Sequence, residues 1–106
     1  MDFNFELRYN PHIYLDIQKA VDFYTEETKS DQLGRRFIQH VEITLSKLNQ
    51  AALNYQVRFD DVRMIPVPSF PFLVHYRVSE ETNTVFVEAI FHVRENPETW
   101  QTRLKK

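Results

Sequence analysis

Side chains that can transfer protons or stabilise negative charge recur in two neighbouring segments, His75 and Arg77 in the first and Glu88 and His92 in the second. Histidine and glutamate serve as general acids and bases, and arginine stabilises an anionic transition state. Within each segment the two polar residues are separated by an even number of positions, two in the first segment and four in the second. Most of the residues between the two members of each pair are apolar. Because side chains alternate between the two faces of a strand, the pattern predicts a β-hairpin with one polar face.

We therefore expect residues 70–92 to form two strands joined by the polar turn 79–83. Residues 62–67 alternate in the same way and predict a third strand, which its prolines restrict because proline donates no ladder hydrogen bond. With one common register, the apolar face would comprise Val62, Met64, Phe72, Val74, Tyr76, Val85, Val87, Ala89 and Phe91. The open face would then carry Arg63, His75, Arg77, Glu88 and His92.

Two helices are expected to cover the apolar face. Residues 3–9 alternate as a half-buried strand, and Asn10-Pro11 is a typical helix start before an amphipathic pattern that continues to about Thr28. A second apolar stripe runs to about Gln50, and the short connection predicts an antiparallel helical hairpin in which Gly34 permits a close approach.

The remaining segments complete the expected fold. Residues 55–59 are a candidate for a short strand, and Asn96-Pro97 predicts a short C-terminal helix that carries Trp100. The sequence thus predicts an α+β two-layer sandwich in the order β-α-α-β-β-β, with the helical hairpin on a small, mostly antiparallel sheet.

Composition limits the possible functions. A chain of 106 residues with fifteen aromatic residues and one glycine predicts a single compact domain over residues 1–106, and it excludes a disordered protein. The formal charge of −2 provides no overall attraction to nucleic acid, so such a role would need a local basic patch. Cysteine is absent, which excludes disulfides and thiol catalysis. We see no basic leader and no apolar run of membrane-spanning length, and we expect a cytoplasmic protein with no membrane partner.

An ordered set of short segments resembles the RelE/ParE superfamily of bacterial toxins from type II toxin-antitoxin systems, particularly the branch called plasmid stabilisation proteins. The matching segments are AVDFY at 20–24, LGRRF at 33–37, VR at 62–63, FPF at 70–72, VHYRV at 74–78 and FHVRENP at 91–97, followed by Trp100 and Arg103. The resemblance implies a helical hairpin against a small sheet and a cognate antitoxin as partner. It also implies one of two activities, because RelE-like members cleave messenger RNA on the ribosome without a metal, whereas ParE-like members inhibit DNA gyrase.

The ribonuclease hypothesis assigns catalysis to Arg63, Arg77 and His92. Arg63 matches the strand arginine that RelE-like enzymes use on the phosphate, and His92 lies near the end of the last strand, where that branch tends to place its acid or base. His75, Glu88 and Arg94 are secondary candidates. The structural alternative is that Arg77 and Glu88 form a cross-strand ion pair and that both histidines are ordinary half-exposed side chains.

Two features favour gyrase inhibition over RNA cleavage. The first is the sequence pI near 6.1, because entry into a polyanionic site favours a basic protein. The second is the absence of the lysine-rich loop of RelE-like enzymes. The inhibitor hypothesis assigns target binding to Arg94, Trp100 and Arg103 in the C-terminal segment. A third alternative is a non-toxic member that only binds its antitoxin.

Partners and cofactors follow from the same hypotheses. In all of them, exposed apolar residues such as Phe86 and Ile90 would bind the antitoxin. No metal or cofactor is expected, since no two histidines have the short spacing of a zinc motif, and His12 and His40 are expected on helix surfaces.

Overall fold

The structure, a computed structural model, describes residues 4–105 and confirms the α+β fold. In chain order the elements are β1 (Glu6–Tyr9), α1 (His12–Thr28), α2 (Gln32–Ala51), the 3-10 turn η1 (Ala52–Asn54), β2 (Val57–Phe59), β3 (Val62–Pro66), β4 (Phe72–Ser79), β5 (Thr84–His92) and α3 (Pro97–Leu104). The predicted order lacked one strand, because the three-residue β2 was only a candidate. Residues 1–3, part of the predicted first strand, lie outside the described residues.

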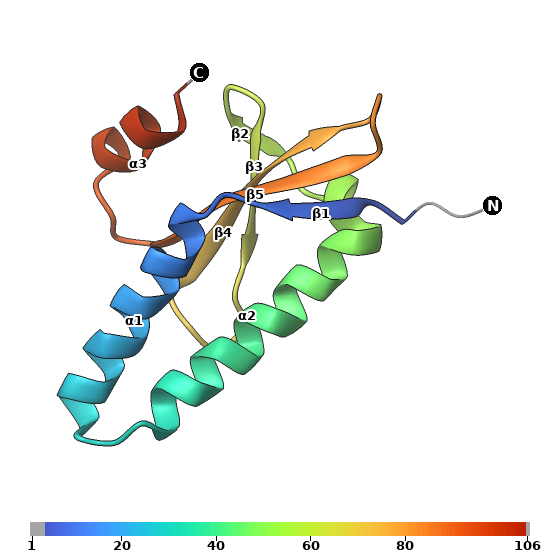
Figure 1. The fold of residues 1–106 in the computed structure, drawn as a ribbon. Helices are drawn as coiled ribbons and strands as arrows, with labels where there is room; N and C mark the ends of the chain where they lie inside the picture. The colour runs from blue at the N-terminus through green and yellow to red at the C-terminus, as the bar shows by residue number, and fades with distance from the viewer. Residues whose placement is uncertain (1–3, 106) are drawn as a thin grey trace.

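The two long helices form the predicted antiparallel hairpin beside the sheet (Figure 1). The Asn10 side chain accepts a hydrogen bond from the N–H of His12 at 2.9 Å, and the Ser30 hydroxyl accepts one from the N–H of Gln32 at 3.2 Å, so the first amide of each helix has a side-chain acceptor. Gly34 faces α1, where an added Cβ would lie 3.0 Å from the Val21 Cγ1 atom. The glycine therefore sets the close packing of the two helices, as the sequence predicted.

The five strands form one sheet in the order β1-β5-β4-β3-β2. Strand β1 pairs parallel with β5, and the other neighbours are antiparallel. The turn between β4 and β5 falls at the predicted residues, with Asn83 in the left-handed region at φ 54°. Since β5 extends to His92 while β1 ends at Tyr9, no strand of residues 4–105 pairs with the last part of β5 on that side.

The main core lies between the helical hairpin and the sheet. Phe37 is fully buried, and its ring centroid lies 4.9 Å from that of Phe72 and 5.3 Å from that of Phe70. Tyr76 is also fully buried, and its hydroxyl donates to the Ala52 carbonyl at 2.6 Å. Burial raises the pKa of the Tyr76 phenol to about 12, so this side chain remains a neutral hydrogen-bond donor that ties β4 to the end of α2.

A β-bulge in β5 changes the predicted distribution of side chains between the two faces. Tyr76 pairs with Val87 and His75 pairs with Ala89, so Glu88 has no residue opposite it. An extra residue reverses the alternation beyond it. The prediction that Ala89 and Phe91 face the helical hairpin is therefore wrong, and Ile90 occupies the hairpin face instead.

The predicted orientation of β3 is wrong as well. Ile65 pairs with Val74 and belongs to the main core, whereas Val62 lies in a cluster on the other face. Met64 pairs with His75, which places it on that other face too. Alternation in the sequence separates Val62 and Met64 from Arg63 and Ile65, but it does not show which of the two sets faces the helices. The register with β4 decides this.

The second face of the sheet is partly covered by α3 and is not open over its whole area. Val62, Ala89, Phe91 and Leu104 form a small buried cluster there, with Phe59 and Trp100 packed against it. Figure 1 shows α3 as a separate short helix, away from the α1–α2 hairpin. The helix therefore adds a partial cover to the two-layer sandwich.

Candidate functional site

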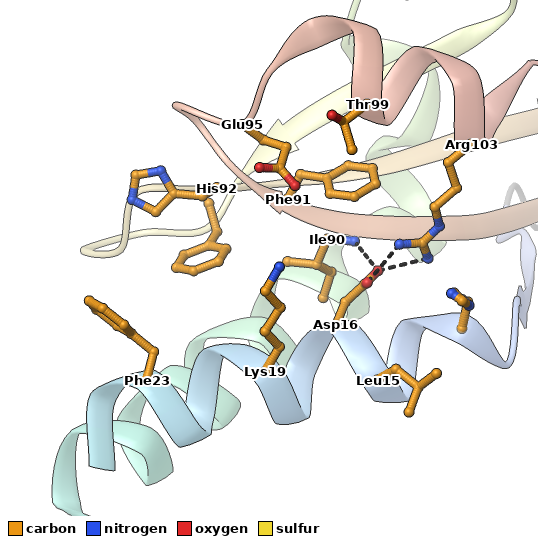
Figure 2. A pocket seen from close by; sticks show the side chains of 12 residues that line it. Leu15, Asp16, Lys19, Phe23, Ile90, Phe91, His92, Glu95, Thr99 and Arg103 are labelled. Carbon is orange, nitrogen blue, oxygen red and sulfur yellow. Dashed lines mark hydrogen bonds and ion pairs between the residues drawn. The ribbon is translucent and has the colours of Figure 1, made fainter. Parts of the chain in front are cut away.

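A groove of about 650 Å³ runs between α1, the end of β5 and the segment leading into α3. Figure 2 shows it with α1 along one side and α3 along the other. Its lining residues are His12, Leu15, Asp16, Lys19 and Phe23 on α1, Phe72, Ile90, Phe91 and His92 on the sheet, and Glu95, Thr99 and Arg103 on the C-terminal segment. It thus brings together three parts of the chain that are far apart in sequence.

The apolar part of the groove includes two strongly exposed side chains of α1. Leu15 is 64% and Phe23 is 57% exposed, and they stand eight residues apart. Residues at this spacing lie on one side of a helix, about 12 Å apart along its axis. Lys19 lies midway between them. Large apolar side chains exposed in a groove are typical of a binding surface rather than of an isolated surface residue.

The polar part of the groove is organised by Asp16. Its two carboxylate oxygens accept hydrogen bonds from Arg103 at 2.7 and 2.9 Å, and Oδ2 also accepts the N–H of Ile90 at 3.0 Å (Figure 2). The Ile90 amide lies beyond the end of β1 and so lacks a strand partner, and Asp16 supplies its acceptor. One carboxylate therefore connects α1, β5 and α3.

Two other charges of the groove, Lys19 and Glu95, lie on opposite sides of it. Within residues 4–105 neither side chain has an ion-pair or hydrogen-bond partner, in contrast to Asp16 and Arg103. The groove therefore presents an available cation on the α1 side and an available carboxylate on the C-terminal side.

Arg77, one of the three predicted catalytic residues, is held in a structural network. Its guanidinium donates to Asp61 at 2.7 Å, to Glu88 at 2.6 Å and to the carbonyl of Leu104, and its side chain is only 12% exposed. Because a guanidinium has five N–H donors in a fixed plane, these partners define its orientation. The expected alternative, a cross-strand pair between Arg77 and Glu88, is what the structure contains.

His75 is buried, which contradicts the expectation of a half-exposed side chain. It is 1% exposed, and its ring lies between Phe91 and Trp100, with centroid distances of 5.2 and 5.3 Å. Burial lowers the pKa of the imidazole to about 4, and the opposing effect of the Leu73 carbonyl is smaller. Since a carbonyl only accepts, the Nδ1–H of neutral His75 donates to it at 3.1 Å.

Arg63 and His92 do not join the other predicted polar residues. Arg63 pairs with Tyr76 and donates to the Tyr55 carbonyl at 2.5 Å, on the hairpin side of the sheet. His92 pairs with Phe72 and contacts its ring with a centroid distance of 5.2 Å. The prediction of one shared polar face is wrong, because Arg77 lies on the α3 side whereas Arg63 and His92 lie on the hairpin side.

The residues predicted to bind partners have different surroundings. Arg94 is exposed, Trp100 packs against Phe59, and Arg103 is paired with Asp16. Of the two apolar candidates, Phe86 is 39% exposed, but Ile90 is 3% exposed, so the prediction that Ile90 lies exposed on the open face is wrong. Ile90 does line the groove.

Sequence reasoning missed the groove and its residues on α1. An amphipathic pattern places the charged Asp16 and Lys19 on the solvent side of the helix, and it gives no role to Leu15 or Phe23. A signal was present, since Leu15 and Phe23 are large apolar residues outside the stripe that faces the core. The partner of Asp16 lies 87 residues away, which no local pattern reveals.

The fold is shared with a solved structure of a chromosomal ParDE TA system from P. aeruginosa. The match has a TM-score of 0.72 at 17% sequence identity and covers 85% of this chain and 97% of the other chain. A comparison with curated proteins finds no match. The family described as the ParE toxin of the type II toxin-antitoxin system parDE matches residues 7–97. The chain therefore belongs to the ParE toxin family, within the superfamily that the sequence resembles.

Within residues 4–105 no helix is long and apolar enough to cross a membrane, and no group of three or more His, Asp or Glu side chains is arranged to hold a metal ion.

Proposed function

We propose that this protein, over residues 1–106 as one toxin domain, inhibits DNA gyrase by protein contact and is neutralised by a cognate antitoxin. The observation that carries the proposal is the separation of the ribonuclease candidates. Arg77 is enclosed by Asp61, Glu88 and the end of α3, whereas Arg63 and His92 lie on the opposite side of the sheet. Metal-free RNA cleavage needs its acid, base and cations at one phosphate. Membership of the ParE toxin family agrees with inhibition.

The target-binding surface in this proposal is the C-terminal segment with Arg94, Trp100 and Arg103. Arg94 is the exposed cation of the three, so it supplies the direct contact. Trp100 and Arg103 fix the position of α3 through Phe59 and Asp16. The alternative function is RelE-like cleavage of ribosome-bound messenger RNA, with cytoplasmic targets in both cases.

Two assays on the purified protein separate these functions. We expect inhibition of gyrase supercoiling together with intact messenger RNA in a translating bacterial extract. Arg94→Gln should weaken the inhibition, and Arg8→Gln, an exposed arginine on β1, is the matched control. Ribosome-dependent cuts that disappear in Arg63→Ala and His92→Ala, with circular dichroism unchanged, would instead establish the ribonuclease. A protein inactive in both assays that still binds its antitoxin would be the non-toxic family member.

For the antitoxin we propose an amphipathic helix seated in the groove between α1 and α3. Leu15 and Phe23 provide apolar contacts at helical spacing over about 12 Å, which is two turns of a partner helix. Lys19 and Glu95 make the groove dipolar, so a complementary helix carries a carboxylate toward α1 and a cation toward the C-terminal segment.

Adjacent residues on α1 give a matched test. Leu15 and Tyr14 are 64% and 65% exposed, but only Leu15 lines the groove. We expect Leu15→Ser to weaken binding of the cognate antitoxin at least about tenfold, because one well-buried apolar contact is lost. Tyr14→Ser should leave the dissociation constant within about twofold of the wild type. Equal effects of the two substitutions on the dissociation constant would place the antitoxin elsewhere.

A further inference from the structure

The C-terminal helix α3 is held on the second face of the sheet by a small number of side-chain contacts. Trp100 packs against Phe59 and His75, and Leu104 is 5% exposed within the small cluster. Arg77 donates to the Leu104 carbonyl, and Arg103 pairs with Asp16. A helix forms no backbone hydrogen-bond ladder with a sheet. These side-chain contacts therefore determine whether α3 stays docked.

Asp16 differs from the other contacts because it belongs to α1 and joins both layers. Its side chain is 11% exposed and that of Arg103 is 24% exposed, so the pair is largely shielded from water. The Arg103 guanidinium also lies 4.9 Å from the centroid of the Phe91 ring and 3.4 Å from the Glu88 carbonyl. Loss of one charge would leave the other without its counter-ion in a shielded position, a state that undocking relieves by hydration.

We infer that α3 is a separately docked element and that Asp16 is the positioning residue that holds it in place. On this inference the sheet and the helical hairpin remain folded when the Asp16–Arg103 pair is broken, while α3 leaves the sheet. Asp16 acts through Arg103, and its second contact, the N–H of Ile90, holds the carboxylate in the orientation that the guanidinium requires.

Docking of α3 also determines the shape of the groove, since Thr99 and Arg103 line it. An occupant of the groove contacts α3 only in the docked state, so binding and docking stabilise each other. This second step rests on the function proposed above, in which the occupant is the antitoxin helix. The antitoxin would then also hold the C-terminal segment, the proposed target-binding surface, in one fixed position.

The protein contains one tryptophan, and it lies on α3, so its fluorescence reports docking directly. The first variant is Asp16→Asn, which removes the charge but keeps an oxygen that can accept from Ile90. The matched control is Asp31→Asn, because Asp31 also pairs with an arginine, Arg35, at 2.6 Å, but in an exposed i,i+4 pair at the start of α2. Arg103→Gln is a second variant that leaves Asp16 and Ile90 in place.

We expect Asp16→Asn and Arg103→Gln to shift the Trp100 emission to longer wavelength and to raise its acrylamide quenching constant toward that of the urea-unfolded protein. Far-UV circular dichroism should keep a cooperative unfolding transition, and Asp31→Asn should match the wild type. If both variants retain the wild-type emission and quenching, or if emission changes only together with global unfolding, the inference is overturned. This measurement needs no partner, so it is independent of the proposed function.

The coupling to the groove is tested by adding the neighbour-encoded antitoxin to Asp16→Asn. We expect weaker binding than to the wild type, and we expect saturating antitoxin to restore the wild-type emission of Trp100. An undocked variant that binds antitoxin with unchanged affinity and keeps its shifted emission would overturn the coupling. A wild-type protein that binds no antitoxin and leaves gyrase active would refute the proposed function, and the docking of α3 by Asp16 would stand on the first measurement.

Discussion

The two faces of the sheet are stabilised in different ways. The face toward the α1–α2 hairpin buries a continuous set of aliphatic and aromatic side chains around Phe37 and Tyr76. Among the described residues, the face toward α3 buries a cluster of four apolar residues, and around them lie His75, Arg77, Glu88 and the Asp16–Arg103 pair. Apolar burial favours folding without directional requirements, whereas a polar contact depends on its exact partner. The hairpin face therefore provides most of the stability of the fold. The α3 face is the one on which the position of an element, the helix α3, can change.

Removal of Phe37 should have the largest effect. Its ring is fully buried and contacts Tyr24, Phe70 and Phe72. We expect Phe37→Ala to lower the free energy of unfolding by about 3–5 kcal/mol, the usual cost of such a cavity. The half-buried Trp100 supplies the comparison, and Trp100→Ala should cost less than half as much. Urea denaturation followed by circular dichroism measures both, and equal losses would contradict the difference between the faces.

The buried His75 should make the α3 face sensitive to acid. The pKa of the imidazole is about 4 in the folded protein and about 6.5 when it is unfolded. The unfolded chain therefore binds a proton that the folded protein excludes, and stability falls as the pH decreases from 6.5 to 4. The full loss is about 3 kcal/mol.

Substitution of His75 isolates this contribution. We expect His75→Leu to remove this pH dependence. As the pH is lowered from 6.5 to 4, the unfolding free energy of the variant should therefore rise relative to that of the wild type. Carboxylates titrate in the same range, but they are common to both proteins and cancel in the difference. A difference that stays constant with pH would show that His75 is accessible to protons in the folded state.

Arg77 should contribute to stability through its partners. Arg77→Met leaves Glu88, whose side chain is 22% exposed, without its cation. A fully buried pair costs about 3–5 kcal/mol to break in this way, and we expect about 2 kcal/mol here because both side chains retain some solvent contact.

A double variant distinguishes a structural role of Arg77 from a catalytic one. If the cost of Arg77→Met arises from the unpaired carboxylate, then Glu88→Gln in the same chain should restore part of the stability. A catalytic arginine held at the expense of stability would give the opposite result, with Arg77→Met as stable as the wild type or more so.

The elements themselves could be predicted because their signals are local. Asn10 and Pro11 mark the start of α1, and the turn at 79–83 separates two alternating segments. The distribution of side chains between the faces could not be predicted, because the bulge at Glu88 is defined by pairing with β4 rather than by the sequence of β5. One extra residue moved Ile90 and His92 to the hairpin face, away from the polar face expected of them.

The site was harder to predict than the fold for a related reason. Its central residue, Asp16, lies on α1, and its partners Ile90 and Arg103 are 74 and 87 residues away. An aspartate on the polar side of an amphipathic helix is normally solvated, so no local pattern distinguishes Asp16 from its solvated neighbours. Arg103 was selected through the family resemblance, but as a target-binding residue rather than as the partner of a carboxylate.

The smallest effect concerns the close packing within the helical hairpin, where two opposing contributions determine whether a substitution of Gly34 raises or lowers the free energy of unfolding. Alanine is favoured over glycine within a helix by about 1 kcal/mol, so Gly34→Ala should stabilise α2 if space allows. The added Cβ would lie 3.0 Å from Val21 Cγ1, and a β-branched side chain in a helix has almost no alternative rotamer. We therefore expect the collision to prevail and Gly34→Ala to destabilise the protein by about 1 kcal/mol.

Removal of the colliding methyl group should reverse the sign. In the Val21→Ala background, Gly34→Ala meets only the Val21 carbonyl at 3.6 Å and the Thr25 hydroxyl at 3.7 Å, which are ordinary contact distances. The helical preference should then appear as a gain in unfolding free energy relative to Val21→Ala alone, measured by urea denaturation. If Gly34→Ala destabilises both backgrounds equally, the two helices are separated by backbone contacts, and Val21 is not the residue that requires glycine.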